Sequence, residues 1–548
     1  MSDECLMLGD HAIILRSILT EVEKLAAAKC TATAHLPLKP SSTSQSRVNP
    51  ACTNVHNQSS NEARKVAEAI ALQRHEALCD FLAKNSGIDV VRIIGDDHQH
   101  TSTCPSQPTS GVPEIVLTPL EFKRRYVWRN IPAIIRGLDQ KHLGSFHNLA
   151  KLWRKHNPDG ETTIQCSWFK KNVGGETTVP VRKPLRHTEA TSMLDEEGRS
   201  RECDTTEMSM NQWIEYCHDD TSKNSTCNGE ECGNKLYLKD WHLMQFMETK
   251  GQKEEKKKKK SETEGNRLLF PLYVVPSIFE RDILNPFLRK YFGGDYRFTY
   301  WGPAASSTAL HSDVLNSFSW SFNVVGEKDW TFFCPPSLAR ESSLNGGGEE
   351  AEGESISFVI TQHEGEAIFV PSGWQHEVRN IKETLSINHN WFTAASIDKV
   401  WECIMIEAKS VEDECDQWGI PSNDWDARET MLRGCIGLNV SMYFFALLVS
   451  LVQEISLFDS SSMQPAHGLQ PKGSEDNFDE CLFNIHRLSH QLECMLKQSP
   501  SSMSGSKSVD HYNPHLAQRL SATLMSQELA ERAFDLANQL VQWKERGF

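Results

Sequence analysis

Two stretches of this 548-residue chain give the strongest structural signal: T-A-L-H-S-D-V, residues 308–314, and G-E-A-I-F-V-P-S-G-W-Q-H-E-V, residues 365–378. The first contains His311 and Asp313, and the second contains His376. Side chains alternate between the two faces of an extended strand, so His311 and Asp313 point the same way. The second stretch has an apolar run that ends at Pro-Ser-Gly, which predicts a strand leading into a tight turn. Two strands of one barrel would then present the three side chains to one metal ion.

Two histidines and one carboxylate are the ligand set of a facial triad. Such a set leaves the remaining coordination positions of the metal open, an arrangement with which non-heme iron oxygenases bind a cosubstrate and oxygen together. A closed structural zinc site would need four protein ligands. A His-x-Asp pair alone is weak evidence, because the chain has 21 histidines. The interpretation therefore depends on the residues around the pair.

Lys328 supports the interpretation. It lies in the alternating, strand-like stretch F-N-V-V-G-E-K-D-W-T-F-F, residues 322–333. A cation inside a barrel is costly to bury without an anion. If the open metal positions hold a 2-oxo acid, Lys328 is a natural partner for the far carboxylate of that acid. The alternative is an exposed lysine at a strand end, beside Glu327 and Asp329.

Longer segments around these residues resemble the jumonji C (JmjC) family of 2-oxoglutarate- and Fe(II)-dependent oxygenases, and most closely its jumonji-domain-containing protein 4 subgroup. The resemblance covers about residues 115–455. The segments that carry it are Y-R-F-T-Y-W-G-P-A-A-S-S-T-A-L-H-S-D (296–313), S-F-S-W-S-F-N-V-V-G-E-K-D-W (317–330), G-E-A-I-F-V-P-S-G-W-Q-H-E-V-R-N (365–380), L-S-I-N-H-N-W-F (385–392) and L-Y-L-K-D-W-H-L (236–243).

The resemblance implies a fold and a set of site residues. The expected fold is a mainly β catalytic core, a double-stranded β-helix or cupin-like jelly roll, with helical N-terminal and C-terminal extensions, α+β overall. Short β-patterned runs separated by Gly and Pro agree with it. The expected cofactors are Fe(II), 2-oxoglutarate as cosubstrate, and O2. The implied iron ligands and catalytic residues are His311, Asp313 and His376, and the implied 2-oxoglutarate-binding residues are Lys328, Thr308 and Asn390.

The chain departs from the wider family at Ser321, where some members have an asparagine facing the cosubstrate. The departure leaves the contacts of the C1 carboxylate open. The resemblance implies a dioxygenase that hydroxylates a side-chain carbon, namely a lysine, with translation termination factor 1 as substrate, and that releases succinate and CO2. Two alternatives remain: an N-methyl lysine or arginine (histone) demethylase that uses the same chemistry, and a non-catalytic jumonji scaffold.

The net charge indicates the kind of binding partner, and the distribution of cysteines indicates the cellular compartment. The formal net charge is −16, so we expect a protein substrate and no direct nucleic-acid binding. The 16 cysteines are scattered without the spacing of a disulfide framework, which indicates a reducing compartment. The N-terminus starts M-S-D-E-C without a basic segment, so no signal peptide is expected. We therefore expect a cytoplasmic or nuclear location.

The pattern predicts four parts of the chain. Helical spacing over 4–28, 61–85 and 512–545 predicts terminal helices, and the resemblance implies a homodimer through the C-terminal helices. The apolar run 442–452 is too short to span a bilayer, so we expect a packed helix and no membrane contact. The parts are a helical and linker-rich N-terminal region at 1–112, a JmjC catalytic domain at 113–395 with a disordered Lys-rich insertion at about 250–266, a C-terminal helical region at 396–460, and linkers with terminal helices at 461–548.

A short helix and an edge strand are predicted where the catalytic domain begins. The sequence L-T-P-L-E-F-K-R-R-Y-V-W-R-N-I-P-A-I-I-R-G, residues 117–137, has the corresponding pattern. Pro132 is acceptable near the start of an edge strand, because proline lacks the backbone N–H of a ladder.

Overall fold

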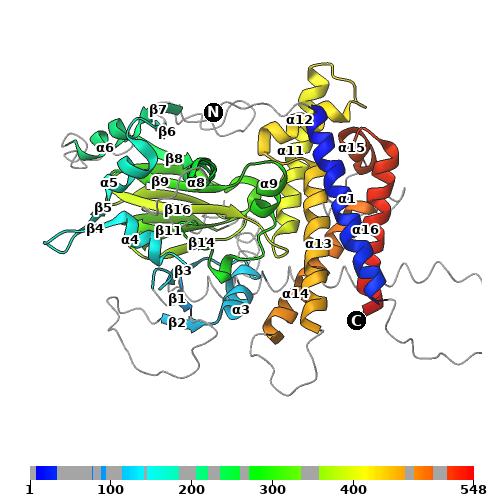
Figure 1. The fold of residues 1–548 in the computed structure, drawn as a ribbon, viewed down its shortest axis with the longest axis horizontal. Coiled ribbons are helices and arrows are strands. Elements are labelled where there is room, and N and C mark those ends of the chain that lie inside the picture. The colour runs from blue at the N-terminus through cyan, green and yellow to red at the C-terminus, as the bar shows by residue number, and fades with distance from the viewer. Residues whose placement is uncertain are drawn as a thin grey trace, which may run out of the picture. The chain divides into compact units, whose positions relative to one another are not determined.

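A computed structural model describes much of the chain, and its contacts divide it into two units (Figure 1). The barrel unit comprises Asp80–Asn285 and Asp295–Trp391. The helical unit comprises Met1–Cys79, Pro286–Gly294 and Phe392–Phe548. The described residues are 8–33, 74, 77, 88–93, 114–140, 145–183, 205–219, 235–258, 271–334, 357–462, 474–497 and 515–547.

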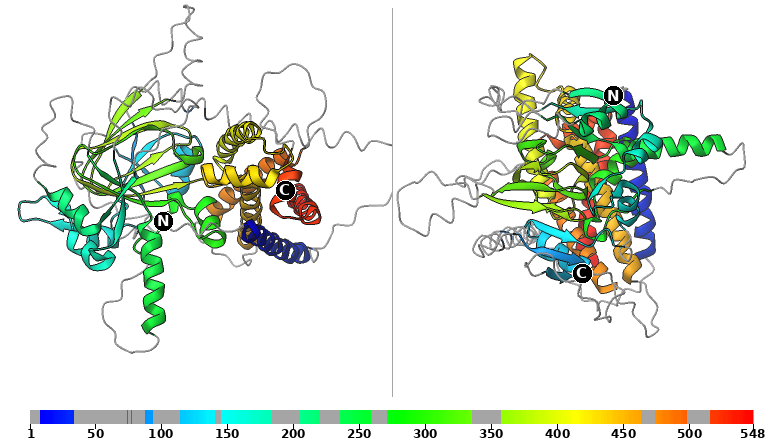
Figure 2. Two further views of the ribbon diagram at one scale, coloured as in Figure 1. Left: turned by 90° about the horizontal axis from the view of Figure 1, so that it is seen from above. Right: turned by 90° about the vertical axis from the view of Figure 1, so that its left-hand side faces the viewer.

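Eight consecutive strands form the barrel. In chain order, the first, eighth, third and sixth are neighbours in one sheet (β9-β16-β11-β14), and the second, seventh, fourth and fifth are neighbours in the other (β10-β15-β12-β13). This interleaving is the predicted double-stranded β-helix, seen rolled up in the left view of Figure 2. The strands are β9 Arg297–Gly302, β10 Ser307–His311, β11 Phe318–Val325, β12 Lys328–Phe333, β13 Ser357–Gln362, β14 Ala367–Val370, β15 Gln375–Asn380 and β16 Thr384–Trp391.

Further strands extend the first sheet to ten, in the order β2-β1-β3-β14-β11-β16-β9-β8-β6-β7. They are β1 Val90–Ile93, β2 Glu114–Leu117, β3 Ala133–Arg136, β6 Thr178–Arg182, β7 Thr205–Ser209 and β8 Tyr237–Trp241. The prediction of an edge strand after Pro132 is wrong. β3 lies inside the sheet, between β1 and β14, and Pro132 precedes it, so no ladder hydrogen bond is lost.

Burial explains why β11 and β16 lie at the centre of the larger sheet. Every residue of both strands is buried, the pattern of a strand that is covered on both faces. Aromatic side chains cover one of them: Phe146 stacks on Phe322 with 4.1 Å between ring centroids, and Phe279 stacks on Trp320 at 5.1 Å. By contrast, β15 alternates between exposed and buried residues, with His376 among the buried ones.

Short helices and one small hairpin complete the barrel unit. The helix predicted near residue 119 is present and continues as a π-helix, and its N-terminus has a capping box between Thr118 and Glu121. The elements are α3 Pro119–Phe122, η1 Lys123–Val127, α4 His147–Trp153, β4 Arg154–His156, β5 Thr162–Ile164, α5 Cys166–Phe169, η2 Lys170–Gly174, α6 Met210–His218, α8 Leu243–Lys258, η4 Ser277–Phe279 and η5 Val314–Asn316.

The helical unit packs around α13. This helix is buried among α1, α14, α15 and α16. Over Val440–Phe458 it is long and apolar enough to cross a membrane by length and composition, and 78% of that window is buried in the structure. The apolar segment is therefore longer than the predicted run 442–452. The prediction that it forms a packed helix is confirmed. The helices are α1 Leu8–Thr33, α9 Leu284–Tyr291, α11 Ile397–Gln417, α12 Trp425–Ile436, α13 Val440–Ser462, α14 Ser474–Leu496, α15 Leu516–Thr523 and α16 Gln527–Gly547.

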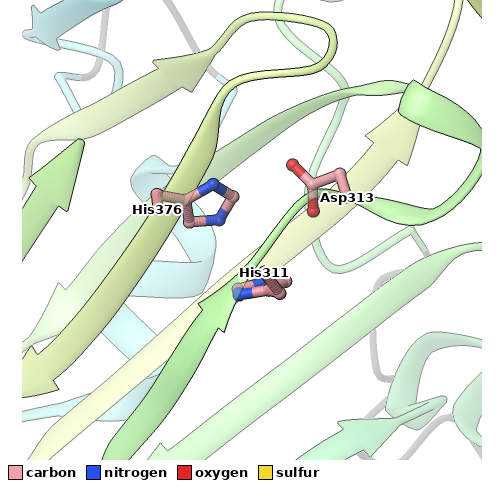
Figure 3. A group of neighbouring side chains, drawn as sticks. All are labelled: His311, Asp313 and His376. Carbon is pink, nitrogen blue, oxygen red and sulfur yellow. The ribbon is translucent and has the colours of Figure 1, made fainter. Parts of the chain in front are cut away.

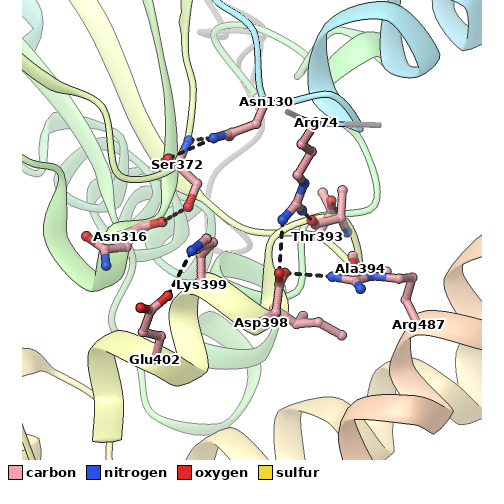
Figure 4. Close-up of polar contacts among 12 residues, drawn as sticks. Arg74, Asn130, Asn316, Ser372, Thr393, Ala394, Asp398, Lys399, Glu402 and Arg487 are labelled. Carbon is pink, nitrogen blue, oxygen red and sulfur yellow. Dashed lines mark hydrogen bonds and ion pairs between the residues drawn. The ribbon is translucent and has the colours of Figure 1, made fainter. Parts of the chain in front are cut away.

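Two ionic groups connect the helices of the helical unit, and the second of them is fully buried. Asp398 on α11 bonds Arg74 at 2.9 Å and Arg487 on α14 at 2.6 Å, which ties residues that are far apart in the sequence (Figure 4). Arg519 on α15 bonds Glu429 on α12 at 2.7 Å, and both side chains are 1% exposed. Charges so deeply buried have to be paired.

Some helix boundaries differ from the predictions. The helix predicted over 4–28 is confirmed as α1, but the one predicted over 512–545 is two helices, because the chain turns at Met525 with a φ of +49°. α14 begins at Ser474, inside residues 460–480 that the polar sequence predicted to be a linker, and α8 runs to Lys258, inside the insertion predicted to be disordered. Nearly all of the helix predicted over 61–85 lies outside the described residues.

Candidate metal centre

The barrel brings His311, Asp313 and His376 together (Figure 3). β10 and β15 are neighbours, and His311 is paired directly with His376 in their register. The two rings are 4.4 Å apart between centroids, and the ligand atoms of all three residues lie within 4.8 Å of one another. Asp313 follows β10, at the start of η5.

Both histidines are held with the same ring nitrogen toward the protein. His311 Nδ1 lies 2.9 Å from the carbonyl oxygen of Ala309, and His376 Nδ1 lies 3.1 Å from that of Trp374. A carbonyl oxygen only accepts, so each Nδ1 carries the proton and each Nε2 keeps a lone pair for a metal. Burial, followed by the nearby His376, lowers the pKa of His311 to about 4. The imidazole of His311 is thus neutral at neutral pH, as a metal ligand has to be.

Asp313 has one oxygen in a hydrogen bond and one buried oxygen without a partner. Its Oδ1 accepts from the Asn390 amide at 2.9 Å. Its Oδ2 is buried and bonds nothing in the described part of the protein. A buried carboxylate oxygen without a partner is costly, and a cation between the two Nε2 atoms would satisfy it. Iron(II) fits this donor set of two imidazoles and one carboxylate.

Lys328 fits the far end of a dicarboxylate cosubstrate. It begins β12 and is 1% exposed, and its Nζ donates to the Ser386 hydroxyl at 2.7 Å. Burial, followed by the charge of Lys239, lowers the pKa of Lys328 to about 7. Ser386 in turn accepts from the Asn388 amide at 3.0 Å. Among the described residues no carboxylate pairs with Lys328, so a bound carboxylate would supply its counter-charge.

A β-bulge places Thr308 on the same side as His311. Thr308 is opposite Val378, and His311 is opposite His376. The two residues of β10 that lie between them therefore have a single residue of β15, Glu377, opposite them. Val378 and His376 are both buried. Without the bulge, residues three apart would point to opposite faces. The structure thus brings the predicted cosubstrate residue Thr308 onto the inner face beside the metal ligands.

Position 321 is a serine in this chain, but an asparagine lies directly opposite it on the neighbouring strand. Ser321 on β11 is opposite Asn388 on β16, and its hydroxyl is buried without a partner in the described residues. Asn390, predicted to contact the cosubstrate, donates to Asp313, and its contact with the cosubstrate stays a prediction. Asn388 and Asn390 are two apart on one strand, so they share a face.

Lys239 is a residue of the site that no sequence pattern marked. Its Nζ lies 5.6 Å from the ring centroid of Tyr300 and 6.0 Å from that of Tyr237. After burial and neighbouring groups, its charge contributes to the lowered pKa of His311 and of Lys328. A register shift between β8 and β9 occurs at this point of the chain. Such a shift depends on strand pairing, so local sequence could not reveal it.

Comparisons with known proteins agree with this geometry. The family model described as "JmjC domain, hydroxylase" matches residues 351–391. The chain is 30% identical over 309 residues to the zebrafish (Danio rerio) 2-oxoglutarate and iron-dependent oxygenase JMJD4, covering 53% of this chain and 67% of the relative. The human (Homo sapiens) JMJD4 is 28% identical over 303 residues, covering 52% and 64%. The arginine-specific demethylase JMJ20 of Arabidopsis thaliana is 28% identical over 361 residues, covering 59% and 66%. The matches thus span about two thirds of each relative.

Proposed function

This chain belongs to the JmjC family of 2-oxoglutarate- and iron-dependent oxygenases, and we propose that it hydroxylates a side-chain carbon of a protein substrate. The proposed target is a lysine, and the proposed substrate protein is translation termination factor 1, which the subgroup resemblance implies. Iron and 2-oxoglutarate, when bound, supply the oxygen activation and yield succinate and CO2. The residues of the chain hold both groups and orient the target carbon.

One observation favours an enzymatic function over a non-catalytic scaffold. The two histidines each donate through Nδ1 to a backbone carbonyl, and Asp313 keeps one buried oxygen without a partner. A metal ion requires three ligand atoms that point to one place. A scaffold would not need this arrangement, and the unpartnered carboxylate oxygen would only lower its stability.

The charge of Lys239 supports hydroxylation over demethylation. In demethylation the reacting carbon is bonded to a cationic nitrogen, so the positive charge has to come to the metal. Lys239 is close enough to His311 to lower the pKa of that histidine, together with burial and His376. Like charges in a partly desolvated site repel. A carbon in the middle of a lysine side chain can reach the same place while its ammonium stays several bonds away.

Demethylation is the second candidate, because the Arabidopsis relative is named an arginine-specific demethylase. The two reactions share the metal and the cosubstrate and differ in the carbon that is presented. They also differ in product, since a hydroxylated N-methyl group is lost as formaldehyde.

The test supplies the full chain with Fe(II), 2-oxoglutarate and O2, and offers translation termination factor 1 and histone peptides, methylated and unmethylated. We expect substrate-dependent succinate release and a product heavier by one oxygen atom on an unmethylated lysine. Formaldehyde together with loss of a methyl group would instead establish demethylation. The control is His311→Ala, and succinate release no higher than that of the control with every substrate would refute an enzymatic function.

We also propose that the partner is a protein and not a nucleic acid. The net charge of −16 supports this, because phosphate backbones are bound through clustered basic residues. Retention on a DNA column at physiological salt would contradict it.

A further inference from the structure

Three segments of the barrel unit meet at Ser372 (Figure 4). Asn130 lies between η1 and β3, Ser372 lies in the turn between β14 and β15, and Asn316 ends η5. Ser372 is 4% exposed, so water does not compete freely for its hydrogen bonds. We call these three residues the loop clip.

Hydrogen bonds through Ser372 connect the loop clip. The Asn130 amide donates to the Ser372 carbonyl at 3.0 Å, and the Ser372 N–H donates to Asn130 Oδ1 at 2.8 Å. The Ser372 hydroxyl donates to the Asn316 carbonyl at 2.5 Å. The backbone and the side chain of one serine thus join two otherwise separate loops.

Two of the three segments lead to a metal ligand. The Asn316 N–H donates to the Asp313 carbonyl at 3.1 Å, so Asn316 closes the single turn that starts at Asp313. On the other side, Ser372 lies two residues before Trp374, whose carbonyl orients the His376 ring. The Ser372 hydroxyl therefore links the turn that carries Asp313 to the turn that leads to His376.

The backbone around the loop clip is strained. Asn130 has a φ of +60°, Leu315 of +60° and Asn316 of +46°. Residues other than glycine adopt this region at a free-energy cost, and they stay there only when their surroundings hold them. Hydrogen bonds from Ser372 to two of these residues provide such support.

We propose that Asn130 and Ser372 are positioning residues that set the separation between Asp313 and His376, and thereby the affinity and geometry of the metal site. They touch neither metal nor substrate. This role holds whichever protein carbon is oxidised, so it does not depend on the proposed substrate.

The test measures Co(II) and Mn(II) binding to the full chain, without cosubstrate or turnover. In Ser372→Ala the hydroxyl link is lost, and in Asn130→Gly both amide hydrogen bonds are lost while the positive φ becomes unstrained. We expect each variant to bind metal roughly 10- to 100-fold more weakly, as outer-shell substitutions do. We also expect the absorption bands of bound Co(II) to change, which a loss of stability alone would not cause.

Two controls separate positioning from stability. Ser209→Ala removes a hydroxyl of similar role in fold stability, the N-cap of α6 that accepts from Gln212, and should lower the unfolding midpoint without changing Co(II) affinity. Ser372→Thr keeps a hydroxyl and should restore the Co(II) spectrum at least in part. If Ser372→Ala and Asn130→Gly only lower the unfolding midpoint, with wild-type Co(II) affinity and spectrum, the proposal is overturned.

Discussion

The Lys328 ammonium is the clearest case of a single residue whose surroundings change its chemistry. Its side chain is buried, and burial with the charge of Lys239 lowers its pKa to about 7. In the unfolded chain the pKa of a lysine is near 10.5. Between these pH values the unfolded chain binds more protons than the folded one, so the stability of the ligand-free protein rises with pH across this window.

This lowered pKa predicts how 2-oxoglutarate binding depends on pH. The carboxylate needs the charged ammonium, so we expect the affinity of the metal-loaded protein for 2-oxoglutarate to fall as the pH rises above about 7. Titration calorimetry under anaerobic conditions in two buffers should also show proton uptake on binding near neutral pH. Lys328→Met should lose the pH dependence and most of the affinity, and its ligand-free form should be more stable than wild type at pH 7. If Lys328→Met binds 2-oxoglutarate as tightly as wild type does, Lys328 is not part of the cosubstrate site.

Asn390 gives a second prediction at this scale. Because its amide donates to Asp313 at 2.9 Å, we expect Asn390→Ala to weaken Co(II) binding about 10-fold. The matched control is Asn388→Ala on the same strand, whose amide donates to Ser386 and should leave metal affinity unchanged. If Asn390→Ala lowers 2-oxoglutarate affinity alone, its role is the cosubstrate contact that the sequence predicted.

Strand β10 is the element in which the local sequence and the pairing with a neighbouring strand together decide where the site residues point. Its bulge keeps Thr308 and His311 on one face despite their spacing of three residues. The Ala309 carbonyl, which lies within the bulge, accepts from His311 Nδ1 at 2.9 Å. Bulges are common beside active sites, because they re-aim side chains.

Deletion of Leu310 tests the bulge. Leu310 is 42% exposed, and its loss restores one-to-one pairing with Thr308 and His311 still on the inner face. We expect a folded protein whose Co(II) affinity is lowered severalfold, because the Ala309 carbonyl no longer meets His311. Leu310→Ala keeps the bulge and should bind Co(II) as wild type does. Equal affinity in the two variants, measured by calorimetry, would show that the bulge has no role in the site.

Elements could be predicted from the sequence where neighbouring residues encode them, and not where they depend on pairing with distant strands. The triad, the turn at Ser372 and the alternating strands rest on short-range patterns, and the barrel was implied by the family resemblance with which these patterns agree. The interior place of β3 depends on pairing with β1 and β14, which no local pattern encodes. α14 was missed because its polar first turns resemble a linker. The terminal helix was expected to be continuous because its apolar period persists across the turn at Met525.

On the scale of the whole molecule, each unit has its own core. The barrel unit is centred on aromatic residues and fully buried strands, while the helical unit is centred on α13. Buried ion pairs occur in the helical unit where helices distant in sequence meet, as at Arg519 and Glu429. Such pairs are costly to break singly and much less costly to replace together.

A double-mutant cycle tests that pair. Arg519→Met alone should lower the free energy of unfolding of the helical unit by about 3–5 kcal/mol, because it leaves the buried Glu429 charge unpaired. Arg519→Met with Glu429→Leu should recover part of that loss, measured by denaturant unfolding. Arg519 also bonds Glu412, whose side chain is 25% exposed, and Glu412→Gln serves as the comparison for a partly exposed partner. If the losses in the double mutant simply add, the two charges do not depend on each other.

The order of strands in the barrel has a consequence for the newly made chain. His311 belongs to the second strand of the barrel and His376 to the seventh, and they face each other only after β15 pairs with β10. A chain that still lacks β15 therefore offers only two of the three ligands, the first histidine and the carboxylate. The ligand set that would hold iron is thus completed late in synthesis, after the seventh strand of the barrel has been made.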